Sequence, residues 1–383
     1  MPPPATRPRK GFEVAAWIDR LGGAVERHPS WWIKLGSIET TLMESALPAR
    51  IDRPIYVTGL ARSGTTILLE TLASHPDVAT HRYRDFPFLF TPYLWNRWLD
   101  LVPRKEEQPA ERSHGDGIVV TSESPEAFEE MLWMTFFPDR HDPSVGVVLD
   151  RSAHNPRFER FYRDHIRKLL AVRGGRRYAA KGNYNVTRIG YLAKLFPDAR
   201  FVIPVRDPVW HVASLMKQHR LFLDGQNNNP CARRHLRRVG HFEFGEDRQP
   251  INIGDDAATA EIVGLWRAGE EVRGWARYWS QMHGHIADLI DGDAVLRRAI
   301  HVVRYEQLCA APCPVLAGLL KHCGLSDNPG FLSRLAARFH QPTYYRPSFK
   351  PGELAIIAGE TVEAARRFGY DADLAPALRQ SAQ

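Results

Sequence analysis

A short apolar segment that runs directly into a glycine-bearing loop constrains this fold more than any other feature of the sequence. Residues 54–58 (Pro-Ile-Tyr-Val-Thr) have the composition of a buried strand, and the loop 59–66 (Gly-Leu-Ala-Arg-Ser-Gly-Thr-Thr) follows at once. Residues 67–75 then show a helical pattern that stops before Pro76. A strand, a glycine loop and a helix in this order are typical of an α/β unit that binds an anion at the helix N-terminus.

A second unit of the same kind follows later in the chain. Residues 201–205 (Phe-Val-Ile-Pro-Val) predict a strand, and Asp207 and Pro208 predict the N-cap and first residue of a helix. Pro204 argues against a central place for this strand, because proline cannot donate to a ladder. With further strands predicted at 177–180 and 301–304, the pattern predicts an α/β, P-loop-like three-layer fold, in which a parallel sheet is flanked by helices on both faces.

The charge balance favours anionic ligands. The 383 residues carry a net charge of +7 and have a pI of about 9.3. Arginines are spread along the chain rather than gathered in dense runs, so we expect no nucleic-acid partner. Four cysteines, at positions 231, 309, 313 and 323, lack CxxC spacing and fit free thiols in a reducing compartment better than a metal cluster. The sequence shows neither a signal peptide nor a transmembrane span, so a cytoplasmic location is expected.

The loop lacks the residue that nucleotide hydrolysis needs. Its glycines, Gly59 and Gly64, have the spacing of a P-loop, but Thr65 stands where the P-loop lysine belongs. Such a loop still binds anionic groups through its backbone N–H groups, whereas it is poorly equipped to cleave a nucleoside triphosphate. Arg62 can supply the missing positive charge, and the hydroxyls of Thr65 and Thr66 add donors.

These residues resemble the 3′-phosphoadenosine 5′-phosphosulfate (PAPS)-dependent sulfotransferase superfamily. The likeness rests on residues 62–66 (Arg-Ser-Gly-Thr-Thr) and on Arg206 with Ser214 eight residues later, and looser similarity extends over about 54–325. It implies that Arg62, Ser63, Gly64, Thr65 and Thr66 hold the 5′-phosphosulfate. It also implies that Arg206 and Ser214 hold the 3′-phosphate and that 3′-phosphoadenosine 5′-phosphate (PAP) is the product.

The resemblance further implies a catalytic lysine, Lys181, beside the sulfonate. A sulfuryl group carries less charge than a phosphoryl group, so Arg62 and Lys181 can stabilise its transfer without a metal. The resemblance and the composition together predict a tail at 1–11, a helical segment at 12–50 and a sulfotransferase domain at 51–370. A lid or insertion is predicted at 224–260, and a second tail at 371–383.

The general base stays open among several residues. Related enzymes place a glutamate about twenty residues after the loop, but residues 80–90 contain none, and Asp85 is the nearest carboxylate. Arg82 and Arg84 flank Asp85 and weaken it as a base. His114, which Asp116 could orient, is an equal candidate because histidine transfers protons near neutral pH. Glu123 is a third.

We expect the acceptor to be a small molecule, lipid or carbohydrate with a hydroxyl or an amine. The sequence does not indicate whether the protein forms oligomers. Aromatic residues at 86–98 and 131–137 are predicted to form core or a pocket wall, and an apolar wall would suit a lipid or phenol. Two alternatives to the sulfotransferase function remain. One is a P-loop nucleotide-dependent phosphotransferase or kinase, which would require the missing lysine. The other is a nucleotide-binding protein without turnover.

Overall fold

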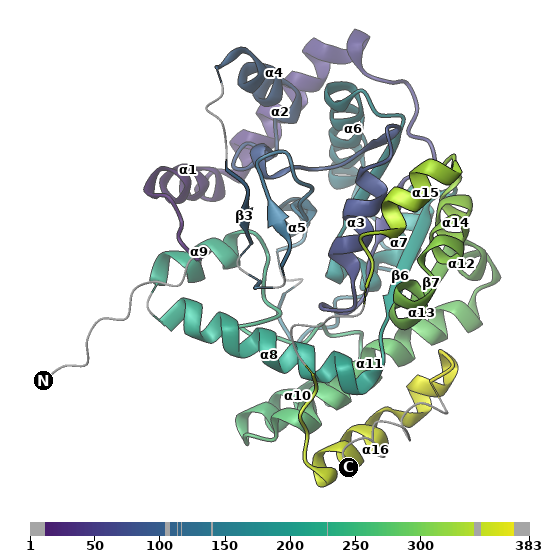
Figure 1. Cartoon of the computed structure of the whole chain (residues 1–383). Coiled ribbons are helices and arrows are strands. Elements are labelled where there is room, and N and C mark those ends of the chain that lie inside the picture. The colour runs from purple at the N-terminus through teal and green to yellow at the C-terminus, as the bar shows by residue number, and fades with distance from the viewer. Residues whose placement is uncertain are drawn as a thin grey trace, which may run out of the picture.

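Five parallel strands form the central sheet, in the order β2-β5-β1-β6-β7 (Figure 1). The computed structural model describes residues 12–103, 108–112, 114–115, 117–138, 141–227, 229–340 and 346–370. The strands are β1 (Ile55–Val57), β2 (Val78–Ala79), β5 (Arg177–Lys181), β6 (Arg200–Val205) and β7 (Ile300–Arg304). A separate antiparallel hairpin consists of β3 (Ala110–Glu111) and β4 (Val119–Val120). All four strands predicted for the main sheet are confirmed.

Helices cover both faces of the sheet, which confirms the three-layer α/β fold. Ile55 and Val57 pack on one face, while Tyr56 between them packs on the other. The first face is covered by α3 (Thr65–Ala73), α13 (Tyr305–Ala310), α14 (Pro312–Cys323) and α15 (Pro329–Ala336). The second is covered by α6 (Pro156–Arg173), α7 (Ile189–Leu195), α8 (Pro208–Asn227), α11 (Glu271–Gly292), α12 (Ala294–Ala299) and α16 (Pro351–Arg367).

Most of the remaining helices lie on the side of the molecule that carries the β3–β4 hairpin (Figure 1). They are α1 (Ala16–Arg27), α2 (Pro29–Met43), α4 (Pro92–Leu101), α5 (Glu129–Phe136) and α9 (Pro230–Arg238), whereas α10 (Asp256–Arg267) packs against α11. A fully buried ion pair between Glu39 of α2 and Lys168 of α6, 2.8 Å long, joins the N-terminal helices to the sheet layer. Among the described residues, none of the helices combines the length and the apolar composition that crossing a bilayer requires.

The segment 224–260 contains more helix than its polar composition suggests. It includes the end of α8, all of α9 and the start of α10. Asn229 and Asp255 cap these helices, because their side chains accept hydrogen bonds from the backbone N–H groups of Ala232 and Ala258. The described part of the segment is therefore largely helical, and its role as a lid or insertion stays a prediction, as do the domain boundaries.

Pro204 lies in an internal strand, against expectation. The backbone N–H of Arg200 donates to Pro54, and that of Thr58 donates to the carbonyl of Val202, so alternate residues of β6 face β1. By this alternation the ring nitrogen of Pro204 also faces β1. At the level of Pro204, however, β1 has already ended, since its last residue, Val57, pairs with Val202. The missing donor therefore costs no ladder bond. Asp207, in contrast, caps α8 as predicted, accepting from Trp210 at 3.0 Å.

We expect Pro204→Ala to lower the free energy of unfolding by only about 1–2 kcal/mol, because the rigidity of proline and part of its buried ring are lost, whereas no ladder bond is lost. Ile203→Pro is the matched control. Residue 203 faces β7, so that substitution removes a ladder bond and should destabilise the protein far more. Urea unfolding followed by circular dichroism measures both. A larger loss in Pro204→Ala than in Ile203→Pro would contradict this account of the strand.

Candidate active site

The carboxyl ends of four parallel strands bring the site together. Lys181 ends β5 and pairs with Val57, the last residue of β1, so the lysine lies beside the glycine loop. Arg206 follows β6, and Tyr305 follows β7. Parallel α/β sheets bind ligands at this edge, because the loops that leave the strands open there. Sequence positions more than 200 residues apart thus meet at one place.

The glycine loop adopts a conformation that needs its glycines. Gly59 and Gly64 have φ angles of 138° and 111°, and Arg62 also has a positive φ, 70°. A Cβ on Gly64 would lie 3.0 Å from the Tyr305 ring. The Thr58 hydroxyl ties the loop to the end of β5 by donating to the carbonyl of Gly182 at 2.7 Å. The loop is thereby held with the N-terminus of α3 facing the cavity.

A cavity of about 340 Å³ lies over this loop and is lined by several cations. The cationic side chains are Arg62, Lys181, Arg112, Arg206 and Arg338. Glu70, the carboxylate on this wall, pairs with Arg338 at 2.6 Å. Such a surplus of positive charge suits an anionic ligand with more than one charged group.

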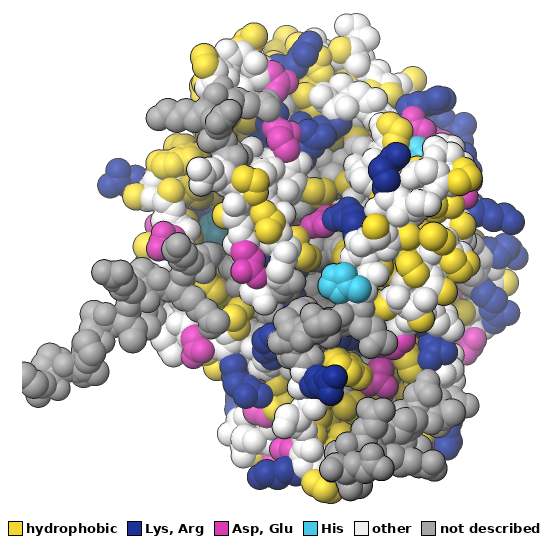
Figure 2. All heavy atoms as spheres, viewed as in Figure 1, with side chains coloured by type: hydrophobic (Ala, Val, Ile, Leu, Met, Phe, Trp, Pro, Cys, Tyr) yellow, Lys and Arg dark blue, Asp and Glu magenta, His cyan; other side chains and the backbone are white. Residues whose placement is uncertain are grey.

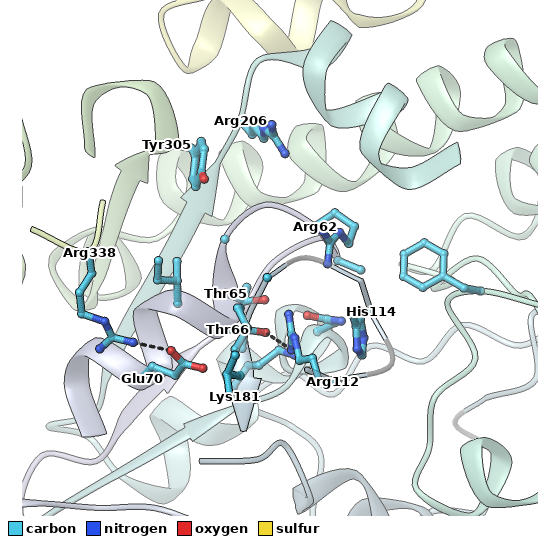
Figure 3. A pocket seen from close by; sticks show the side chains of 18 of the residues that line it. Arg62, Thr65, Thr66, Glu70, Arg112, His114, Lys181, Arg206, Tyr305 and Arg338 are labelled. Atoms are coloured by element: carbon cyan, nitrogen blue, oxygen red, sulfur yellow. Dashed lines mark hydrogen bonds and ion pairs between the residues drawn. The ribbon is translucent and has the colours of Figure 1, made fainter. Parts of the chain in front are cut away.

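The cations occupy two ends of the cavity. Arg112, His114 and Lys181 gather near Thr66, and Arg112 donates to the Thr66 hydroxyl at 3.3 Å (Figure 3). Arg206 lies at the other end beside Tyr305, with its guanidinium 4.9 Å from the ring centroid (Figure 3). The cavity can therefore hold two anionic groups at a distance from each other.

Ser63 and Ser214 lie behind the cavity wall rather than on it. Ser63 is fully buried, and its hydroxyl makes no hydrogen bond to a described residue. Ser214 is also buried, and its hydroxyl accepts from Nε of Arg62 at 3.4 Å. Ser214 thus positions Arg62 in this structure, and a direct contact with a ligand stays a prediction.

A second, larger cavity of about 660 Å³ opens next to the first. Its walls are mainly apolar and come from α1, the 86–99 region, the β3–β4 hairpin and α9; among them are Trp17, Phe86, Trp95, Leu99, Phe128 and Leu236. Both cavities share the residues Arg112, His114, Lys181, Asn183 and His241. A charged ligand in one cavity and an apolar ligand in the other would therefore meet at these five side chains.

A chain of polar contacts leads into this junction. The Asn183 amide donates to Glu243 at 2.7 Å, and Oε2 of Glu243 lies 2.9 Å from Nδ1 of His241, an ion-pair contact rather than a well-aligned hydrogen bond. Nε2 of His241 lies 3.4 Å from Nε2 of His114. If Nδ1 of His241 donates to Glu243 and Nε2 of His114 donates to Nε2 of His241, then Nδ1 of His114 carries the lone pair that can accept a proton. This Nδ1 atom is buried and has no hydrogen-bond partner among the described residues.

Electrostatics keep His114 neutral. Burial lowers the pKa of His114 well below its usual value, and the charges of Arg112, His241, Arg62 and Lys181 lower it further. Burial alone would raise the pKa of Glu243, but His241 and Asn183 outweigh it and bring the pKa to about 2. His114 is thus a neutral imidazole at neutral pH and can accept a proton, and the ionised Glu243 lies on the far side of His241.

Burial also lowers the pKa of Lys181, and Arg112 and Arg62 act in the same direction, although Glu126 and Glu243 oppose them.

The other two candidate bases do not face either cavity. Asp85 is fully buried, and its carboxylate accepts from Arg173, from the Asn96 amide at 2.8 Å and from the backbone N–H of Arg82 at 2.8 Å. We therefore correct the prediction for Asp85, which holds the 82–96 region together. Glu123 is held by Arg82 and Arg84, the latter at 2.8 Å. Asp116 lies outside the described residues.

Sequence reasoning missed Arg112, Asn183, His241 and Glu243. Asn183 lies two residues after Lys181, a spacing that could have drawn attention to it. His241 and Glu243 fall in the segment predicted as a lid, where no periodicity marked them. Arg112 belongs to the short β3–β4 hairpin, which carries no strong pattern.

Fold and site together define a P-loop-like α/β protein in which a cationic cavity adjoins an apolar one. A profile described as the sulfotransferase family matches residues 54–249, just over half of the chain. The omega-hydroxy-beta-dihydromenaquinone-9 sulfotransferases of Mycobacterium bovis and Mycobacterium tuberculosis are 25% identical over 346 residues, which cover 84% of this chain and 76% of theirs. A sulfotransferase structure from Mycobacterium avium superposes with a TM-score of 0.50 at 15% identity, covering 87% of this chain and 81% of that one.

The chain belongs to the sulfotransferase family, and its prediction as a sulfotransferase is confirmed.

We expect Asp85→Ala to lower the free energy of unfolding by about 3–5 kcal/mol, because it leaves the buried Arg173 without its carboxylate. Glu123→Ala, at a partly exposed pair, should cost about 1 kcal/mol or less. Urea unfolding gives both values, and kcat per folded molecule should be kept in both variants. Loss of turnover in stable Asp85→Ala protein would restore Asp85 as a candidate base.

Proposed function

We propose that this enzyme transfers the sulfuryl group of PAPS to the hydroxyl of a hydrophobic, lipid-like alcohol. The observation that carries this proposal is the junction at Lys181 and His114, where the cationic cavity meets the apolar one. The mycobacterial relatives, whose names give a hydroxylated menaquinone as their acceptor, support a lipid-like acceptor here.

The residues of the cationic cavity fit the donor. PAPS carries anionic groups at the 5′ and the 3′ positions of its ribose, and the cavity has cations at both ends. The N-terminus of α3 with Arg62, Thr65 and Thr66 would hold the phosphosulfate, and Arg206 would pair with the remote 3′-phosphate. A kinase function is less well supported, because Thr65 occupies the position of the P-loop lysine.

In the transfer, the acceptor oxygen forms a bond to sulfur while the bond from sulfur to the 5′-phosphate oxygen breaks, and the electron pair leaves on PAP. Lys181 and Arg112 lie where they can stabilise the sulfonate and the departing phosphate. The hydroxyl proton passes to the ring of His114, which lines both cavities; its acceptor nitrogen, Nδ1, is buried in the structure and must become accessible as the acceptor enters. His241 and Glu243 then stabilise the positive charge on the histidine. Binding of the anionic donor offsets the nearby cations and so strengthens His114 as a base.

Arg206→Ala is expected to weaken PAP binding about 10- to 100-fold, because charge-assisted hydrogen bonds of roughly 1.5–3 kcal/mol are lost. Isothermal titration calorimetry with PAP, and with Mg-ATP for comparison, measures this. Arg267→Ala, at an exposed arginine of α10, is the matched control and should bind as wild type. Tighter binding of Mg-ATP than of PAP, or indifference to Arg206→Ala, would refute the proposed donor.

His114→Ala should lower kcat about 10²- to 10⁴-fold, the range of general-base catalysis, while PAP affinity is kept. The product can be followed by mass spectrometry with dodecan-1-ol as acceptor. Glu243→Gln keeps the shape of the side chain and should also lower kcat, since it removes the charge that stabilises protonated His114. Unchanged turnover in His114→Ala would exclude it as the base.

The pH profile gives an independent readout. Neutral His114 is the active form and its pKa is lowered, so kcat/KM should stay level through pH 6.5 and fall only at more acidic pH. Arg112→Gln removes one of the charges that lower this pKa. We expect it to move the acid limb of kcat/KM to higher pH, whatever its effect on rate. An acid limb that does not move would show that another group titrates.

A further inference from the structure

Helix α2 exposes a continuous apolar stripe to solvent. Trp31, Leu35, Ile38 and Leu42 recur at intervals of four, three and four residues, which places them on one face of the helix. Trp31 is 71% exposed and Leu42 is 63% exposed. Large apolar side chains gathered in this way mark an interaction surface, whereas scattered ones do not. We call these four residues the α2 stripe.

The neighbouring helix α4 carries a second stripe. Leu94, Trp98 and Leu101, spaced by four and three residues, are exposed, and Leu101 reaches 83%. The backbone N–H of Leu94 donates to Glu39 of α2 at 2.7 Å, so the first turn of α4 contacts α2. We call the three residues the α4 stripe. In Figure 2 hydrophobic side chains gather over α1 and α4 at the upper left of the molecule.

The α4 stripe adjoins the apolar cavity. Trp98 stacks on Trp95 with ring centroids 5.0 Å apart, and Trp95 lines the cavity. Trp17 of α1 lines the same cavity and is nevertheless 56% exposed. A hydrophobic molecule on this surface could therefore enter the cavity without crossing water.

The charges on these helices are unequally compensated. Their acidic residues all contact a cation: Asp19 and Glu26 contact Arg238, Glu39 contacts Lys168 and Asp100 contacts Arg84. Within the described ranges no carboxylate pairs with Arg20, Lys34 or Arg97, on α1, α2 and α4 respectively. The sequence before α1 contains Arg7, Arg9 and Lys10 and one acidic residue, Glu13. The surface thus combines apolar side chains with uncompensated positive charge.

We propose that the face formed by the α2 stripe, the α4 stripe and Trp17 docks on an anionic lipid bilayer, from which the acceptor enters the apolar cavity. Amphipathic helices with basic and aromatic residues bind at such interfaces. A second copy of the chain fits less well, because an isologous contact would bring the same positive charges together. The inference rests on the proposed lipid-like acceptor, whereas the docking can be measured without turnover.

The test uses the full-length protein and sedimented vesicles of phosphatidylcholine and phosphatidylglycerol in equal parts, with pure phosphatidylcholine as comparison. Trp31→Glu/Leu101→Glu changes one residue of each stripe, neither of which lines a cavity. Ile356→Glu, on an exposed apolar residue of α16 at the other end of the molecule, is the matched control (Figure 1). Thermal unfolding by circular dichroism checks that each variant is folded.

We expect wild type and Ile356→Glu to bind the anionic vesicles, and the double variant to bind them at least about tenfold more weakly because charge replaces apolar contact. Wild type should also bind vesicles of pure phosphatidylcholine more weakly than it binds the anionic vesicles. Absence of wild-type binding, or equal binding by the double variant, would overturn the proposal. So would a concentration-dependent dimer in ultracentrifugation that the double variant abolishes, since it would assign the face to a second copy.

A turnover assay separates this proposal from the proposed function. Sulfation of octan-1-ol dissolved in buffer should be equal in wild type and the double variant, whereas sulfation of hexadecan-1-ol held in vesicles should fall at least about tenfold in the variant. If neither alcohol is sulfated by wild type, the lipid-like acceptor is wrong while the vesicle binding is judged on its own. If hexadecan-1-ol in vesicles is sulfated equally by both proteins, the docking proposal fails.

Discussion

The early end of the central strand is the constraint on which the rest of the site depends. β1 stops at Val57, which pairs with Lys181 on one side and Val202 on the other, whereas β6 continues to Val205. The gap left at the sheet edge is filled by the glycine loop, whose positive φ angles turn the chain into α3. The same gap removes any partner for the nitrogen of Pro204. Loop geometry, the place of Lys181 and the tolerance of a proline in an internal strand thus have one cause.

Positive charge at this edge is held in place by other side chains before any ligand arrives. Arg206 lies against the Tyr305 ring, Arg62 contacts Ser214, and Arg112 contacts Thr66. Holding the cations in this way costs conformational freedom during folding rather than during binding. Together with burial, the charges of Arg112 and Arg62 also lower the pKa of His114. Two of the groups that would bind the donor therefore help to set the protonation state of the neighbouring imidazole.

The sequence predicted those parts whose function depends on local chain geometry. The strand–loop–helix at 54–75 and the cap at Asp207 are short-range patterns, and both are seen in the structure. The prediction of Asp85 as a base rests on its distance from the glycine loop along the chain. That distance says nothing about the direction of the side chain, which is buried in the interior. His241 and Glu243 could not be assigned, because only tertiary packing brings the segment after α9 to the end of β5. Neighbours of Lys181 in sequence were easier to find than its neighbours in space.

The two cavities draw only in part on the same segments of the chain, and this has a consequence for how such enzymes diverge. The cationic cavity depends on the loops that follow the strands of the main sheet and on the β3–β4 hairpin, which contributes Arg112 and His114, and a substitution there disturbs the junction. Much of the apolar cavity depends on α1 and α4, which contribute no strand to that sheet. Mutations can therefore accumulate in these walls while the sheet edge stays constant. One scaffold can in this way acquire new acceptors by gradual change on one side of the molecule, with its donor chemistry inherited intact.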